Sequence, residues 1–96
     1  MKKSIVAAII MAASFGASAG ELCDAVSEVG EAAANARDAG VSLDVAMSVV
    51  SNASPNKQAN QINKVTVEAA YKMANKSPKE VAEITREICI SSIGDN

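Results

Sequence analysis

The chain has 96 residues, a formal net charge of −2, no histidine, two cysteines and a single tyrosine. This composition excludes histidine-dependent catalysis and histidine metal sites, and the cysteines are too few on their own for a structural zinc site. The length allows one small domain, and the acidic balance argues against nucleic acid as a partner, because nucleic-acid binding requires a basic surface.

The N-terminal stretch up to Ala19 predicts a signal peptide. Lys2 and Lys3 form a positive start, an apolar run extends from Ser4 to Phe15, and Ala17-Ser18-Ala19 has the small-x-small pattern of a signal peptidase site. The apolar run of about 12 residues is shorter than the ~20 needed to cross a bilayer, which argues against a membrane anchor. We therefore expect cleavage after Ala19, a periplasmic location, no stable membrane insertion, and a single α-helical domain over residues 20–96.

The first helix of the mature chain is predicted from about Leu22 to Ala39. Its apolar seam consists of Leu22, Val26, Val29, Ala33 and Ala36. Its opposite side carries Asp24, Glu28, Glu31, Asn35 and Asp38. Gly40 supplies a left-handed stop. The second helix, about Leu43 to Ser51, has Ser42 as its N-cap and so little polar surface that we expect it to be the most buried element.

The third and fourth helices are each predicted from a Ser-Pro start. The third begins at Ser54-Pro55, with the serine as N-cap, and runs to about Asn75. Its apolar stripe consists of Ala59, Ile62, Val65, Ala69 and Met73. The fourth begins at Ser77-Pro78, where Glu80 completes a capping box, and ends at Gly94. Its stripe consists of Val81, Ile84, Ile88 and Ser92.

Short connections between these helices make neighbours antiparallel, so the sequence predicts an all-α, up-down-up-down four-helix bundle. In this order the start of the first helix meets the end of the fourth, where Cys23 and Cys89 lie. A cysteine pair in an oxidising compartment most simply forms a disulfide, and the Cys-x-x-Cys pattern of redox enzymes is missing. Closing so long a loop should contribute about 4 kcal/mol to stability in the chain-entropy model.

No residue pattern predicts catalysis. The serines and lysines lie in no catalytic motif, and the chain has no glycine-rich phosphate loop. Clustered carboxylates occur at Glu28 and Glu31 and again within residues 80–87, but they fall on polar helix faces and are best explained as solvated side chains. We therefore expect a protein that is not an enzyme and that holds no cofactor or metal.

Two candidate surfaces for a protein partner remain. The first is the acidic face of the first helix, Asp24, Glu28, Glu31 and Asp38, which could attract a basic partner or simply keep the protein soluble. The second lies on the third helix, where Val67 and Tyr71 are opposite the apolar stripe and near Lys64. An exposed Tyr71 would anchor a partner, whereas helices packed on both sides would bury it, and we favour burial.

The segment from Ala36 to Leu43, together with Cys23, Ala69-Ala70-Tyr71, Ser77-Pro78 and Cys89, resembles a group of uncharacterised small secreted bacterial and prophage proteins. The resemblance covers most of the mature chain. It implies the same small helical, disulfide-linked fold and lends no activity. In general design the chain is also similar to periplasmic acid-stress chaperones and to phage-encoded periplasmic inhibitors of lysis or superinfection, but it shares no motif with either group.

The expected function is therefore that of a small periplasmic, non-catalytic protein that binds another protein, as an inhibitor or immunity factor. One alternative is an acid-stress chaperone, and another is a structural accessory of the envelope. A binder should stay folded and hold one partner, whereas a chaperone should lose its packing and bind an apolar dye in acid. The sequence names neither the partner nor the oligomeric state.

Overall fold

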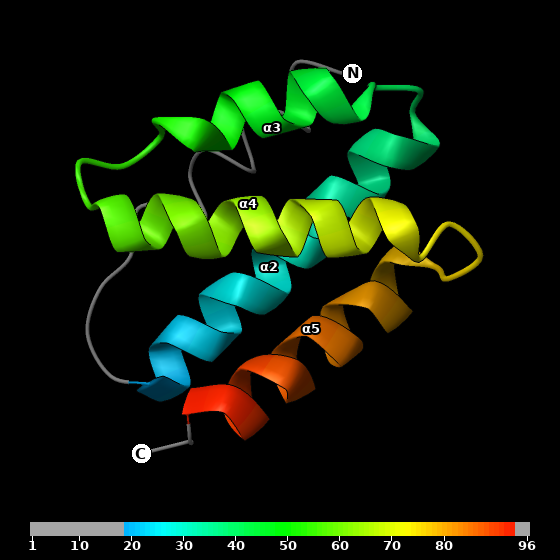
Figure 1. The fold of residues 1–96 in the computed structure, drawn as a ribbon. Helices are drawn as coiled ribbons and strands as arrows, with labels where there is room; N and C mark the ends of the chain where they lie inside the picture. The colour runs from blue at the N-terminus through cyan, green and yellow to red at the C-terminus, as the bar shows by residue number, and fades with distance from the viewer. Residues whose placement is uncertain (1–18, 94–96) are drawn as a thin grey trace.

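The computed structural model describes residues 19–93, which form four helices joined by short turns (Figure 1). These are α2 (Ala19–Asp38), α3 (Leu43–Ser51), α4 (Lys57–Lys72) and α5 (Pro78–Ile93). The chain is the predicted small all-α bundle, in which successive helices run in alternating directions. The predicted signal peptide lies outside the described residues, apart from Ala19 at the start of α2.

The helices form two antiparallel pairs that cross each other (Figure 1). One pair is α2 and α5, which lie side by side, and the other is α3 and α4, with α4 crossing over α2. Although α4 and α5 are consecutive, they contact each other little, since each packs mainly on α2. The core therefore centres on α2 and includes Val29, Ala33 and Ala36 together with Val50 of α3 and Val81 of α5.

The expectation that residues 43–51 are the most buried element is wrong. In α3 only Ala46 and Val50 are buried, and Val45 is 49% exposed. The physical reason is that α3 packs with one side on α4 and leaves its other side to solvent. By contrast, the predicted apolar seam of α2 is confirmed, because all its members except the half-buried Leu22 are buried.

Three of the predicted helix boundaries are confirmed by their caps. Gly40 has a φ of 89°, and the Val41 N–H donates to the Ala36 carbonyl, which closes the end of α2. The hydroxyl of Ser42 accepts a hydrogen bond from the Val45 N–H at the start of α3. The fourth helix has its capping box, because the hydroxyl of Ser77 accepts from the Glu80 N–H and the Glu80 carboxylate accepts from the Ser77 N–H.

The start of α4 differs from the prediction. The N-cap is Asn56, not Ser54, and its side-chain oxygen accepts hydrogen bonds from the N–H groups of Gln58 and Ala59. Ser54 instead pairs with the buried amide of Asn60, whose oxygen accepts from the Ser54 N–H and whose nitrogen donates to the Ser54 carbonyl. The conformation of the loop before α4 is thus fixed by the side chain of Asn60, a residue of α4 itself.

Gly30 allows α2 and α5 to approach closely. A Cβ atom at this position would lie 2.6 Å from Oγ1 and 3.1 Å from Cγ2 of Thr85 on α5. We expect Gly30→Ala to lower the free energy of unfolding by about 1–2 kcal/mol, because the overpacking exceeds the gain of about 1 kcal/mol in helix propensity. Urea denaturation followed by circular dichroism measures this change. A Thr85→Ala background removes the two closest atoms and leaves only Cβ, at 3.3 Å, so the loss should be smaller there. An equal loss in both backgrounds would contradict the explanation.

Asn63 presents an unpaired polar group in the core. Its side chain is fully buried, and among residues 19–93 neither its amide oxygen nor its amide nitrogen has a hydrogen-bond partner. Asn63→Leu should therefore raise the free energy of unfolding by about 1–2 kcal/mol, since an unsatisfied buried polar group carries a penalty of that order. Asn60→Leu is the matched control on the same helix and should be destabilising, because the Asn60 amide is paired with Ser54. Similar losses for both variants in urea denaturation would refute this assignment.

Candidate binding groove

The predicted apolar stripes of the third and fourth helices are only partly buried. Ala59 of α4 and Val81 of α5 are buried, but Val65 on α4 is 56% exposed and Ile88 on α5 is 55% exposed. These two members of the stripes are therefore not packed in the core. Because α4 and α5 each pack on α2 and barely touch each other, the stripe residues between them line the walls of an open groove.

The groove has a volume of about 300 Å³. It is lined by Val26, Gln61, Ile62, Val65, Thr66, Ala69, Thr85, Ile88, Cys89 and Ser92. The two threonine hydroxyls already donate within their own helices, from Thr66 to the Ile62 carbonyl and from Thr85 to the Val81 carbonyl. The groove is therefore mainly apolar and holds no charged side chain in its lining.

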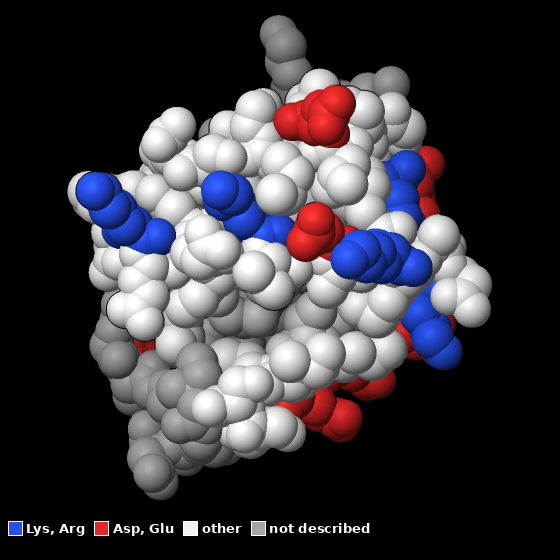
Figure 2. Space-filling model, in the orientation of Figure 1, with Lys and Arg blue, Asp and Glu red and all other residues white. Residues whose placement is uncertain are grey.

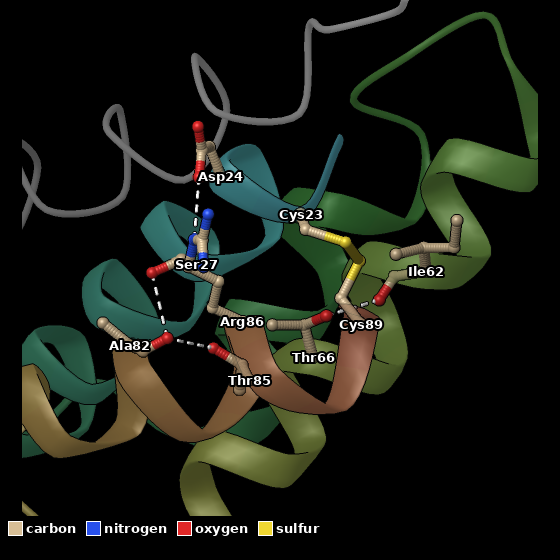
Figure 3. Close-up of a disulfide and its surroundings, with 9 residues drawn as sticks. All are labelled: Cys23, Asp24, Ser27, Ile62, Thr66, Ala82, Thr85, Arg86 and Cys89. Atoms are coloured by element: carbon tan, nitrogen blue, oxygen red, sulfur yellow. Dashed lines mark hydrogen bonds and ion pairs between the residues drawn. A yellow bond between two sulfur atoms is a disulfide. The ribbon is translucent and has the colours of Figure 1, made fainter. Parts of the chain in front are cut away.

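A disulfide lies beside the groove (Figure 3). Cys23 of α2 and Cys89 of α5 are bonded, with their Cα atoms 5.4 Å apart, which confirms the predicted pair. Both cysteines are buried with Val26, and Ile62 of α4 packs against this cluster. The disulfide thus connects the start of α2 to the wall of the groove formed by α5.

Polar contacts reinforce the same pair of helices (Figure 3). The hydroxyl of Ser27 donates to the Ala82 carbonyl over 2.9 Å, and Nε of Arg86 donates to the Asp24 carboxylate over 2.8 Å. The ion pair is solvent-exposed, so it contributes little to stability. Its main effect is on the predicted acidic face, since it neutralises one of the four carboxylates.

The other three members of the acidic face differ in their pairing and exposure. Asp38 pairs with the neighbouring Arg37, Glu28 is exposed and Glu31 is half-buried. None of the four acids lines the groove. With Asp24 and Asp38 both paired inside the fold, this face carries less free negative charge than the sequence implied.

The structure separates the three residues predicted as a surface on the third helix. Val67 is fully buried in the core, as expected from packing on both sides of α4, and is therefore not available to a partner. Tyr71 is half-buried, packs against the same core and donates a 2.7 Å hydrogen bond to the Val41 carbonyl. Lys64 is half-buried. Tyr71 is thus mainly a structural residue that joins α4 to the turn before α3.

The phenol of Tyr71 should make stability depend on pH in alkali. Burial raises the pKa of Tyr71 above its ordinary value of 10.0, and the nearby Arg37 guanidinium partly opposes this effect. A raised folded-state pKa means that the neutral phenol stabilises the fold fully below pH 10 and that this contribution is lost as the pH rises through the folded pKa. We expect Tyr71→Phe to lose about 1 kcal/mol near neutral pH, with the hydrogen bond, and to converge with the wild type in strong alkali. Urea denaturation at several pH values tests this, and a constant difference would contradict it.

Arg37 has a role that the sequence did not indicate. Its side chain is only 11% exposed, and its guanidinium donates to the carbonyls of Ala70, Met73 and Lys76 at 2.7–2.8 Å. These carbonyls belong to the last turn of α4 and to the loop that follows, where carbonyl groups have no N–H partner within the helix. The one signal for this role was that Arg37 is the only base between Gly20 and Pro55.

Between residues 19 and 93, no three acidic or sulfur-bearing side chains are grouped so that they could hold a metal ion. No helix in that range is long and apolar enough to cross a membrane. The apolar groove between α4 and α5 is the candidate functional site, because it exposes Val65 and Ile88 in a concave surface.

Comparison of the chain with protein-family models, curated proteins and solved structures found no match. The fold and the groove together define the class of protein, a small disulfide-linked four-helix bundle with an open apolar groove between its last two helices.

Proposed function

We propose that this chain is a small secreted, periplasmic, non-catalytic protein and that it binds another protein through the groove between α4 and α5. The observation that supports this proposal is the exposure of Val65 and Ile88 on facing walls of the groove. Exposed apolar side chains that are grouped in a concave surface are typical of protein interaction sites, and an apolar groove between two helices suits the apolar face of a partner helix.

The disulfide supports the proposed location, because such bonds persist in oxidising compartments such as the periplasm. A role as an inhibitor or immunity factor requires only a stable surface that covers part of a partner, with no reacting groups. The resemblance to small secreted prophage proteins fits the same proposal and adds no activity to it.

Affinity capture from periplasmic extract, with identification by mass spectrometry, tests the proposal. The bait should be the wild-type chain, a Val65→Asp variant and a Val45→Asp control, since Val45 is similarly exposed but lies on α3 away from the groove. We expect a partner that is retained by the wild type and the control and is lost with Val65→Asp. Retention of the same proteins by all three chains would count against the groove.

The acid-stress chaperone alternative predicts a different outcome. A chaperone should retain many proteins, and only after acidification, with increased binding of an apolar dye. Circular dichroism and dye binding at acidic and neutral pH distinguish the two functions, because a dedicated binder should keep its packing across this range.

A further inference from the structure

The two helices that flank the groove carry opposite charge. On α4 there are three lysines, Lys57, Lys64 and Lys72, against one acid, Glu68. Figure 2 shows basic side chains spaced along α4, a hollow in the white surface below them, and acidic side chains beyond the edge of α5. A partner that fills the groove should therefore place acidic side chains beside α4.

The helix α5 itself combines the two properties that the groove requires of an occupant, an apolar contact and acidic side chains beside it. Its exposed Ile88 provides an apolar contact. Its three acids, Glu80, Glu83 and Glu87, outnumber its two bases, Lys79 and Arg86, and the bases lie on the side of the helix opposite Ile88. At about 100° per residue, these acids lie about 80° to 140° from Ile88, on the flank away from the buried Cys89. The helix therefore presents an apolar edge next to an acidic flank.

We propose that the groove is occupied by α5 of a second copy of this chain. Around a two-fold axis, each α5 packs its Ile88 edge into the groove of the other copy, so that the two contacts are equivalent. The Ile88 edges then face each other at the centre, and the acidic flank of each α5 faces the lysines of the opposite α4. This inference rests on the proposed role of the groove as a protein-contact site, and it names the second copy as the occupant that a different partner must displace.

Sedimentation equilibrium of the full chain over a wide concentration range tests the proposal. We expect a reversible monomer–dimer equilibrium whose dissociation constant rises at least about tenfold in Ile88→Asp and is unchanged in the Val45→Asp control. Both positions are about half exposed, so both variants should fold, which circular dichroism verifies. A chain that stays monomeric throughout, or a dimer that is unaffected by Ile88→Asp, would overturn the proposal.

Charge reversal tests the predicted pairing of α4 with α5. Lys64→Glu/Lys72→Glu and Glu83→Lys/Glu87→Lys should each weaken the dimer at least about tenfold, because like charges then face each other. Mixing the two variants should restore a heterodimer, since both α4–α5 contacts become complementary again. Failure of the mixture to pair would show that α5 does not face α4 of the second copy and would overturn the proposed arrangement.

The two proposals fail in different ways. A chain that is monomeric but loses a captured partner through Val65→Asp would refute the self-association and support the proposed function. A chain that dimerises as described but captures no other protein would support the self-association and refute the binding of a different partner through the groove.

Discussion

Removing the disulfide, by Cys23→Ala/Cys89→Ala or by reduction, should lower the free energy of unfolding by about 4 kcal/mol. The bond joins residues that are 66 positions apart, and a loop of that length restricts the unfolded chain by roughly this amount. For a total stability of about 5 kcal/mol, the lower end of the usual range, this loss leaves the reduced chain close to its unfolding midpoint. Urea denaturation of the oxidised and reduced protein, followed by circular dichroism, measures the difference.

The controls for this experiment use the cysteines one at a time. Because either single substitution abolishes the bond, Cys23→Ala and Cys89→Ala should each lose nearly as much stability as the double variant. Intact mass before and after alkylation of the denatured wild type should show no free thiol. Two free thiols in protein purified from the periplasm, or equal urea midpoints with and without reductant, would refute the prediction.

Replacing Arg37 by methionine should lower the free energy of unfolding by at least about 3 kcal/mol. Methionine keeps much of the packing of the side chain but leaves three carbonyls without their charged donor, and hydrogen bonds to charged groups contribute about 1.5–3 kcal/mol each. Arg37→Lys should lose less, although a single ammonium cannot reproduce the planar fork that reaches all three oxygens.

Lys72→Met is the matched control for Arg37→Met. It also removes one positive charge near the end of α4, but Lys72 is exposed, so the loss should be less than about 1 kcal/mol. Urea denaturation compares the variants, and hydrogen exchange should show faster exchange in the last turn of α4 in Arg37→Met only. Equal effects of the two substitutions would mean that net charge, not the bonds to the carbonyls, explains the result.

The sequence was sufficient to place most helix boundaries, because caps act locally. Ser42 and the capping box from Ser77 to Glu80 satisfy N–H groups within three residues, and Gly40 is the residue that tolerates a left-handed turn. The cap of α4 was missed although Asn56 also acts locally, because the Ser-Pro pattern directed the prediction to Ser54. Ser54 is bound by Asn60, which lies six residues further along and becomes buried only when α4 packs.

The sequence could not reveal the groove. Periodicity shows that Val65 and Ile88 belong to apolar stripes, but a stripe does not specify which helix it faces. Since α4 packs on α2 and α3, its buried face is displaced toward Asn63 and Val67, and the apolar stripe is left partly uncovered. The error in the predicted core and the candidate site therefore have the same origin.

Arg37 and Asn63 were missed for related reasons. A largely buried arginine and a buried asparagine look like surface residues in a sequence, because their burial depends on segments that are distant along the chain. Arg37 finds carbonyls more than 30 positions away, whereas Asn63 finds no partner among residues 19–93. Only the packed structure distinguishes these two outcomes.

The bonds between α2 and the two walls of the groove affect how fast a partner can bind. Near its start this helix holds the α5 wall of the groove through Cys23, and near its end it holds the last turn of α4 through Arg37. Both walls of the groove are therefore bonded to α2, which fixes the distance between them before a ligand binds. At concentrations where the chain is monomeric, an incoming helix finds both walls of the groove already in place. Its association rate with the monomer should then follow diffusion and ionic strength, with no slow conformational phase in stopped-flow measurements.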